Sequence, residues 1–125
     1  MRRLVIAALM ALGVAHPVRS QAELEFFILA EEQARLMAPV IGWGYECGIP
    51  ETSLIRLTYA KTMRLLRFTE GEMRMIDALM TSYDAPGTCP ESSKLKFGEN
   101  VQNVLQIVTE WHDEVAASGY VEHLQ

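Results

Sequence analysis

Apolar residues recur along most of this chain with the 3.6-residue spacing of amphipathic helices, and no segment of useful length alternates as a strand would. After residue 22, this pattern predicts four helices, over about 23–38, 50–68, 70–83 and 90–118. We expect an all-α domain in which they form an up-down-up-down four-helix bundle. The four predicted buried stripes are Phe27, Ala30, Ala34, Met37 and Ile41; Ile55, Tyr59, Thr62, Met63 and Leu66; Met73, Ile76, Met80 and Tyr83; and Val101, Val104, Leu105, Val108, Trp111 and Val115.

Prolines, glycines and a capping motif mark the predicted helix ends. Pro39 and Gly42-Trp43-Gly44 are expected to end the first helix. Pro50 and Pro90 stand where helices are expected to begin, because the missing N–H of proline would be unpaired there in any case. Thr69-Glu70-Gly71-Glu72 fits a capping box, which predicts the start of the third helix.

The last helical segment is the longest. A single helix from Pro90 to Ala117 would measure about 42 Å, whereas the second and third helices reach only about 20–30 Å. We therefore expect a break at Gly98, between a short helix and a main helix.

The first 22 residues have the layout of a secretory signal peptide. Met1-Arg2-Arg3 is positive, Leu4 to Ala15 is apolar, and Ser20-Gln21-Ala22 places small residues at the −3 and −1 positions of a cleavage site. The apolar run is shorter than the roughly 20 residues needed to span a bilayer. We expect cleavage after Ala22 and a periplasmic or secreted mature protein.

Two cysteines, Cys47 and Cys89, are the only ones in the sequence. An even number in an exported protein favours a disulfide. Each cysteine precedes the expected start of a helix, and in an up-down-up-down bundle the loops after the first and third helices lie at the same end. The sequence therefore predicts a Cys47–Cys89 disulfide, which would stabilise the fold by about 4 kcal/mol on the chain-entropy model.

Charge narrows the possible partners. Without residues 1–22 the chain has 8 Lys and Arg against 16 Asp and Glu, a formal charge of −8. Nucleic-acid binding requires a basic surface, so we expect none, and we expect no membrane insertion. Three cations of the second helix, Arg56, Arg64 and Arg67, are predicted to share an outward face. One interpretation is that these cations are solvated and form ion pairs with acidic residues of the other helices. The alternative is that they form a docking surface for an acidic protein partner.

An aromatic segment, Trp43-Gly44-Tyr45, precedes the first cysteine and is expected to form a loop. Aromatic side chains between glycines can form a protein-contact patch. They can equally cover the end of the bundle beside the disulfide. Trp43 and Tyr45 are therefore candidate partner-binding residues with a packing role as the alternative.

No catalytic, cofactor-binding or metal site is expected from the remaining residues. The cluster Glu110-Trp111-His112-Asp113-Glu114 lacks the H-E-x-x-H or E-x-x-H spacing that directs ligands to one metal ion. Met73 and Met75 would lie on different faces of a helix, which favours core packing over a copper site.

Two families of small exported helical proteins share features with this chain. It resembles acid-stress periplasmic chaperones of the HdeA type in its helix-entry cysteines, in Phe97 eight residues after Cys89, and in Trp111 further on. It is also similar to periplasmic immunity proteins against peptidoglycan amidases, in which an aromatic-rich helix leads into a Cys-Gly pair, here Cys47-Gly48 after Trp43. The first resemblance implies a chaperone, and the second implies a dedicated protein partner.

We therefore expect an exported, non-enzymatic protein-binding module, of inhibitor or immunity type, that docks one protein partner. One alternative is an acid-stress chaperone. Protonation of the carboxylates would shift the charge from −8 to about +10, and self-repulsion would open the bundle while the disulfide limits its expansion. The other alternative is a small-ligand or metal carrier.

Overall fold

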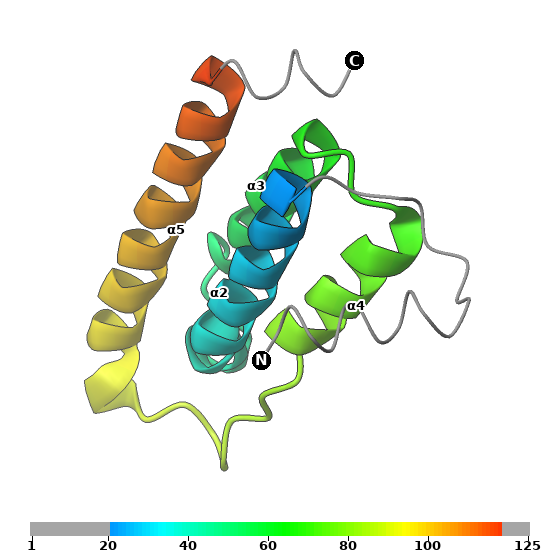
Figure 1. Ribbon diagram of the computed structural model, residues 1–125. Helices are drawn as coiled ribbons and strands as arrows, with labels where there is room; N and C mark the ends of the chain where they lie inside the picture. Colours follow the sequence, from blue (N-terminus) through cyan, green and yellow to red (C-terminus); the bar gives the residue numbers. More distant parts are fainter. Residues whose placement is uncertain (1–20, 119–125) are drawn as a thin grey trace.

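Helices make up most of residues 21–118, the part of the chain that the computed structural model describes (Figure 1). There is no strand in this range, so the predicted all-α fold is confirmed. The predicted signal peptide, apart from its last two residues, lies outside the described residues. The elements are α2 (Gln21–Glu46), α3 (Thr52–Leu65), α4 (Glu70–Met80), the 3₁₀ turn η1 (Glu91–Ser93) and α5 (Lys94–Ala117).

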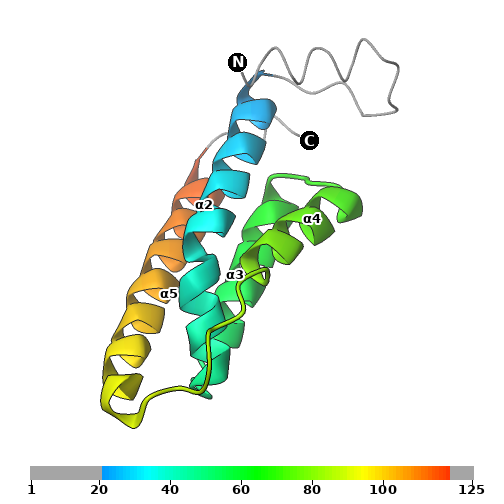
Figure 2. The same ribbon diagram turned by 90° about the horizontal axis from the view of Figure 1, so that it is seen from below.

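The four helices do not pack with equal closeness. Figures 1 and 2 show α5 and α4 on opposite sides of the molecule, with α4 inclined to the other three helices. α3 packs mainly on α5, and α4 packs mainly on α2. The consecutive helices α3 and α4 therefore contact each other only over a short stretch.

The core is formed by the predicted stripes. Ala30, Ile41, Ile55, Ile76 and Val101 are among the side chains with no exposed surface. Periodic apolar positions become buried because each helix turns one face toward its neighbours. Phe27, Met73, Val104, Leu105 and Trp111 are partly buried and pack against this core. Tyr83 is also partly buried, but it follows the end of α4 and lies outside the helical stripe.

The disulfide and the capping box are both confirmed. Cys47, which directly follows α2, is bonded to Cys89, just before η1, with a Cα–Cα distance of 5.1 Å. The Thr69 hydroxyl accepts a hydrogen bond from the Glu72 N–H at 3.1 Å, and the Glu72 carboxylate accepts one from the Thr69 N–H at 2.8 Å. The sequence thus correctly predicted both the disulfide at one end of the bundle and the start of α4.

Two predicted helix ends are wrong. α2 does not stop at Pro39 but continues to Glu46, so the segment Trp43-Gly44-Tyr45 is helical rather than a loop. α5 is likewise continuous through Gly98, and the change of helix type falls instead between η1 and Lys94. In both cases the helix continues despite a local cost, which is about 3 kcal/mol for an interior proline and about 1 kcal/mol for an interior glycine, and packing against neighbouring helices offsets it.

The start of α3 differs by two residues from the prediction. Pro50 lies in the turn before the helix, and the first helical residue is Thr52. The Thr52 side chain is fully buried, and its hydroxyl oxygen, Oγ1, has no hydrogen-bond partner among the described residues. A buried hydroxyl without a partner loses its hydration and gains nothing in return.

Replacing Thr52 with valine should therefore leave stability unchanged or raise the free energy of unfolding by about 1 kcal/mol, because valine has the same shape without the unsatisfied hydroxyl. The matched control is Thr62→Val, since Thr62 is equally buried but donates to the Thr58 carbonyl at 3.0 Å. Urea denaturation should rank Thr52→Val above Thr62→Val, and the reverse order would contradict this account.

Tyr59 joins three helices at the centre of the core. Its side chain has no exposed surface, its hydroxyl donates to the Ala30 carbonyl of α2 at 2.6 Å, and its ring lies 5.3 Å from the Trp111 ring of α5. Burial raises the pKa of the Tyr59 phenol, because the ionised form would lose its hydration.

This raised pKa predicts a loss of stability in alkali. The unfolded phenol ionises near pH 10, so the contribution of neutral Tyr59 is fully present below that pH and is lost as the pH rises above it. Tyr59→Phe should cost about 1 kcal/mol at pH 8, because it removes one buried hydrogen bond. The difference in unfolding free energy between the two proteins should shrink from pH 9.5 to pH 11, and a constant difference would contradict the prediction.

Candidate functional site

A groove with a volume of about 710 Å³ lies between α3 and α4, where the two helices diverge. Its inner surface is mostly apolar, and Leu57 remains 57% exposed at its edge. Polar side chains border this surface. The apolar lining residues are Leu57, Ala60, Met63, Met73 and Ala78, and the polar ones are Tyr45, Ser53, Arg56, Arg74, Asp77 and Thr81.

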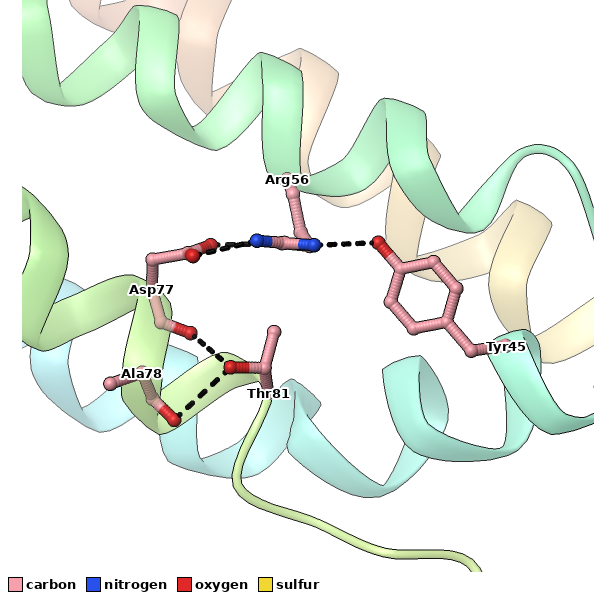
Figure 3. Close-up of polar contacts among 5 residues, drawn as sticks. All are labelled: Tyr45, Arg56, Asp77, Ala78 and Thr81. Atoms are coloured by element: carbon pink, nitrogen blue, oxygen red, sulfur yellow. Dashed lines mark hydrogen bonds and ion pairs between the residues drawn. The ribbon is translucent and has the colours of Figure 1, made fainter.

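Arg56, one of the lining residues, connects three helices (Figure 3). From α3, its Nε and Nη2 donate to the two carboxylate oxygens of Asp77 on α4, at 2.9 and 2.7 Å. Its Nη1 donates to the Tyr45 hydroxyl of α2 at 3.0 Å. We refer to Tyr45, Arg56 and Asp77 as the arginine clamp.

The arginine clamp contains a permanently charged guanidinium and a partly exposed ion pair. The hydrogen bond to Asp77, followed by the one to Tyr45, raises the pKa of Arg56, so the guanidinium is charged at any physiological pH. The Arg56 and Asp77 side chains are 37% and 39% exposed, and solvent screening limits such a pair to about 1 kcal/mol of stability. The clamp therefore joins α2, α3 and α4 with only a modest gain in stability.

The two other predicted cations lie away from the clamp. Arg64 is exposed on the last turn of α3, eight residues after Arg56. Arg67 is also exposed but lies beyond the end of α3, with φ 60°, in the turn in which the Phe68 N–H donates to the Met63 carbonyl at 3.0 Å. The structure thus places Arg56, Arg64 and Arg67 in three different environments rather than on one helical face.

The two predicted aromatic residues lie on different sides of α2. Trp43 is half-buried and stacks on Phe97 of α5, with ring centroids 4.7 Å apart and planes within 6°. Tyr45 is 43% exposed and belongs to the groove. Trp43 is therefore part of the packing near the disulfide, and Tyr45 remains a candidate contact residue.

Charge is distributed very unevenly over the molecule. Residues 52–81, which form α3, α4 and their connection, contain five cations and three acids, for a net charge of +2. The other described residues contain three cations and twelve acids, for a net charge of −9. Lys61, Arg64 and Arg74 are exposed in this basic region, which we call the basic hairpin.

Sequence reasoning did not find the groove itself. Leu57, Ala60 and Asp77 were not singled out, and Met73 was assigned to the core. One signal was present: Leu57 is a large apolar residue outside the buried stripe of its helix. Such a position is a candidate contact residue, although single exposed leucines are also common on ordinary surfaces.

Two kinds of site were sought among the described residues, a cluster of metal ligands and a membrane-spanning helix. Within residues 21–118, no three His, Cys, Asp or Glu side chains come together in a way that could hold a metal ion. No helix in this range combines the length and apolarity needed to cross a bilayer. Comparison with known proteins gives no further identification: no family model, curated protein or solved structure matches the chain.

Proposed function

We propose that this protein is an exported, non-catalytic binding module, of inhibitor or immunity type, that docks one protein partner through the α3/α4 groove. The observation that carries the proposal is the coincidence of the groove with the basic hairpin. An open apolar surface bordered by cations, on an otherwise acidic protein, is complementary to an acidic protein surface and would steer its approach. The disulfide is compatible with an oxidising compartment outside the cytoplasm.

A protein partner fits the groove better than a small ligand does. Small-molecule sites enclose most of the ligand and direct several polar groups toward it. Here the main polar groups, Arg56, Asp77 and Tyr45, bind one another instead. A flat partner surface needs no such convergence, because apolar contact at the centre and charges at the rim suffice.

Site-specific photo-crosslinking in the native host tests the proposal. A photoreactive amino acid would replace Leu57 in the groove or, as the matched control, Ile107 on α5, since these side chains are 57% and 59% exposed. We expect one crosslinked protein from position 57 at neutral pH, its loss on adding Arg74→Glu, and none from position 107.

The other outcomes separate the alternatives. A crosslinked protein from position 107 alone would move the docking surface to α5 and contradict the proposal. Many unrelated proteins, crosslinked from both positions and only after acidification to about pH 3, would instead establish the acid-stress chaperone.

A further inference from the structure

We propose that the segment bound in the α3/α4 groove is a short acidic amphipathic α-helix of the partner, an inference that rests on the proposed function above. The first reason is the backbone. The described residues contain no strand, so the groove offers no sheet edge to which an extended peptide could add. An extended segment on this apolar surface would leave N–H and C=O groups without partners, whereas a helix satisfies its own.

The size of the groove sets the length of the bound helix. On α3 the lining residues run from Ser53 to Met63, a rise of about 15 Å. A partner helix of about ten residues, or three turns, covers that distance.

The apolar lining indicates what the bound helix presents. Ala60 on α3 and Ala78 on α4 are small residues on the two walls, and Leu57 forms an exposed ridge beside them. Met73 adds a flexible, partly exposed side chain that adapts to different shapes, whereas Met63 is buried in the core. The partner helix therefore presents at least one large apolar side chain to the space beside Leu57.

The flanking charges determine the polar positions of the bound helix. Arg56 already donates to Asp77 and Tyr45, so it is a positioning residue rather than the main attraction for a new carboxylate. Recognition falls to exposed cations on both helices, in and beside the groove. Arg74 belongs to α4, whereas Lys61 and Arg64 lie one turn beyond the groove residues Leu57 and Ala60. Carboxylates on both sides of the apolar stripe of the partner helix would face these cations.

The test uses the full chain, with its disulfide intact, and three labelled synthetic peptides of fourteen residues. The first is an acidic amphipathic helix with a central leucine, held helical by a side-chain staple. The second carries a central proline that prevents the helix, and the third has lysine in place of each glutamate. We expect the stapled acidic helix to bind at least about tenfold more tightly than either of the others, as measured by fluorescence anisotropy and NMR shift mapping.

Protein variants connect that binding to the groove. Leu57→Asp and Arg74→Glu should each weaken binding of the acidic helix about tenfold, while Ile107→Asp, at a position of similar exposure on α5, should not change it. Equal binding of the proline peptide, no binding of the stapled helix, or equal losses in Leu57→Asp and Ile107→Asp would each overturn the inference. Crosslinking of one partner from position 57 together with any of these results would leave the proposed function standing and refute only the helix.

Discussion

Removing the disulfide should lower the free energy of unfolding by about 4 kcal/mol. The bond joins residues 42 positions apart, so its loss frees a long loop in the unfolded chain and raises the entropy of that state. Domains of this size are stable by only about 5–15 kcal/mol in total. We expect Cys47→Ala/Cys89→Ser, compared with the oxidised protein by urea denaturation, to have a much lower midpoint and to be partly unfolded at 37 °C.

The choice of substitutions and controls isolates the cross-link. Cys47 is buried and takes alanine, whereas Cys89 is partly exposed and tolerates serine. The wild-type protein reduced with dithiothreitol has no substitution and should match the double variant within about 1 kcal/mol. A loss below about 1 kcal/mol in both preparations would show that the unfolded chain gains little freedom, and would contradict the entropic account.

Removing the disulfide should also affect the α3/α4 groove. Tyr45 lies two residues before Cys47, in the last turn of α2, and its hydroxyl accepts the hydrogen bond from Arg56. Loosening that end of α2 removes one support of the arginine clamp. Crosslinking from position 57 should therefore decrease in the disulfide variant even under conditions in which most molecules remain folded.

Sequence patterns correctly predicted the buried face of α3, the disulfide and the capping box. The stripe Ile55, Tyr59, Thr62, Met63 and Leu66 is buried as expected, because helical periodicity determines which face of α3 meets its neighbours. The disulfide followed from cysteine number and bundle topology, and the capping box from three-residue spacing. None of these conclusions needed the angle between two helices.

The candidate site depends on that angle, and the sequence did not reveal it. The groove exists because α4 inclines toward α2 while α3 packs on α5. Its clamp joins Arg56 to Asp77 across 21 residues, and no spacing rule connects the two. The sequence showed the charged residues of this region. It did not show that Arg56 would be paired while Arg64 and Arg74 remain exposed.

The mistaken helix end at Gly42 and Gly44 leads to the second large effect. These glycines were interpreted as helix breakers, yet both lie inside α2, where they allow close approach of other segments. A Cβ atom on Gly42 would lie 2.6 Å from the Tyr83 carbonyl oxygen and 2.7 Å from its Cδ1. A Cβ atom on Gly44 would overlap the Thr52 Oγ1 atom and lie 2.9 Å from its Cγ2.

Gly42→Ala and Gly44→Ala should therefore each lower the free energy of unfolding by about 2 kcal/mol, because overpacking outweighs the better helix propensity of alanine. Gly98→Ala is the matched control, since Gly98 also lies inside a helix but a Cβ atom there would meet nothing within 4 Å. It should raise stability by about 0.5–1 kcal/mol.

The comparison of the three variants separates two effects of replacing a helical glycine, the gain in helix propensity and the steric overlap of the new Cβ atom with a neighbouring segment. If propensity alone mattered, all three substitutions would stabilise the protein to a similar extent. If close approach controls the first two positions, urea denaturation should separate them from Gly98→Ala by about 3 kcal/mol. Gly42→Ala and Gly44→Ala should cause losses of similar size, because the first Cβ meets the backbone of Tyr83 and the second meets the fully buried, β-branched side chain of Thr52, and neither can move away freely.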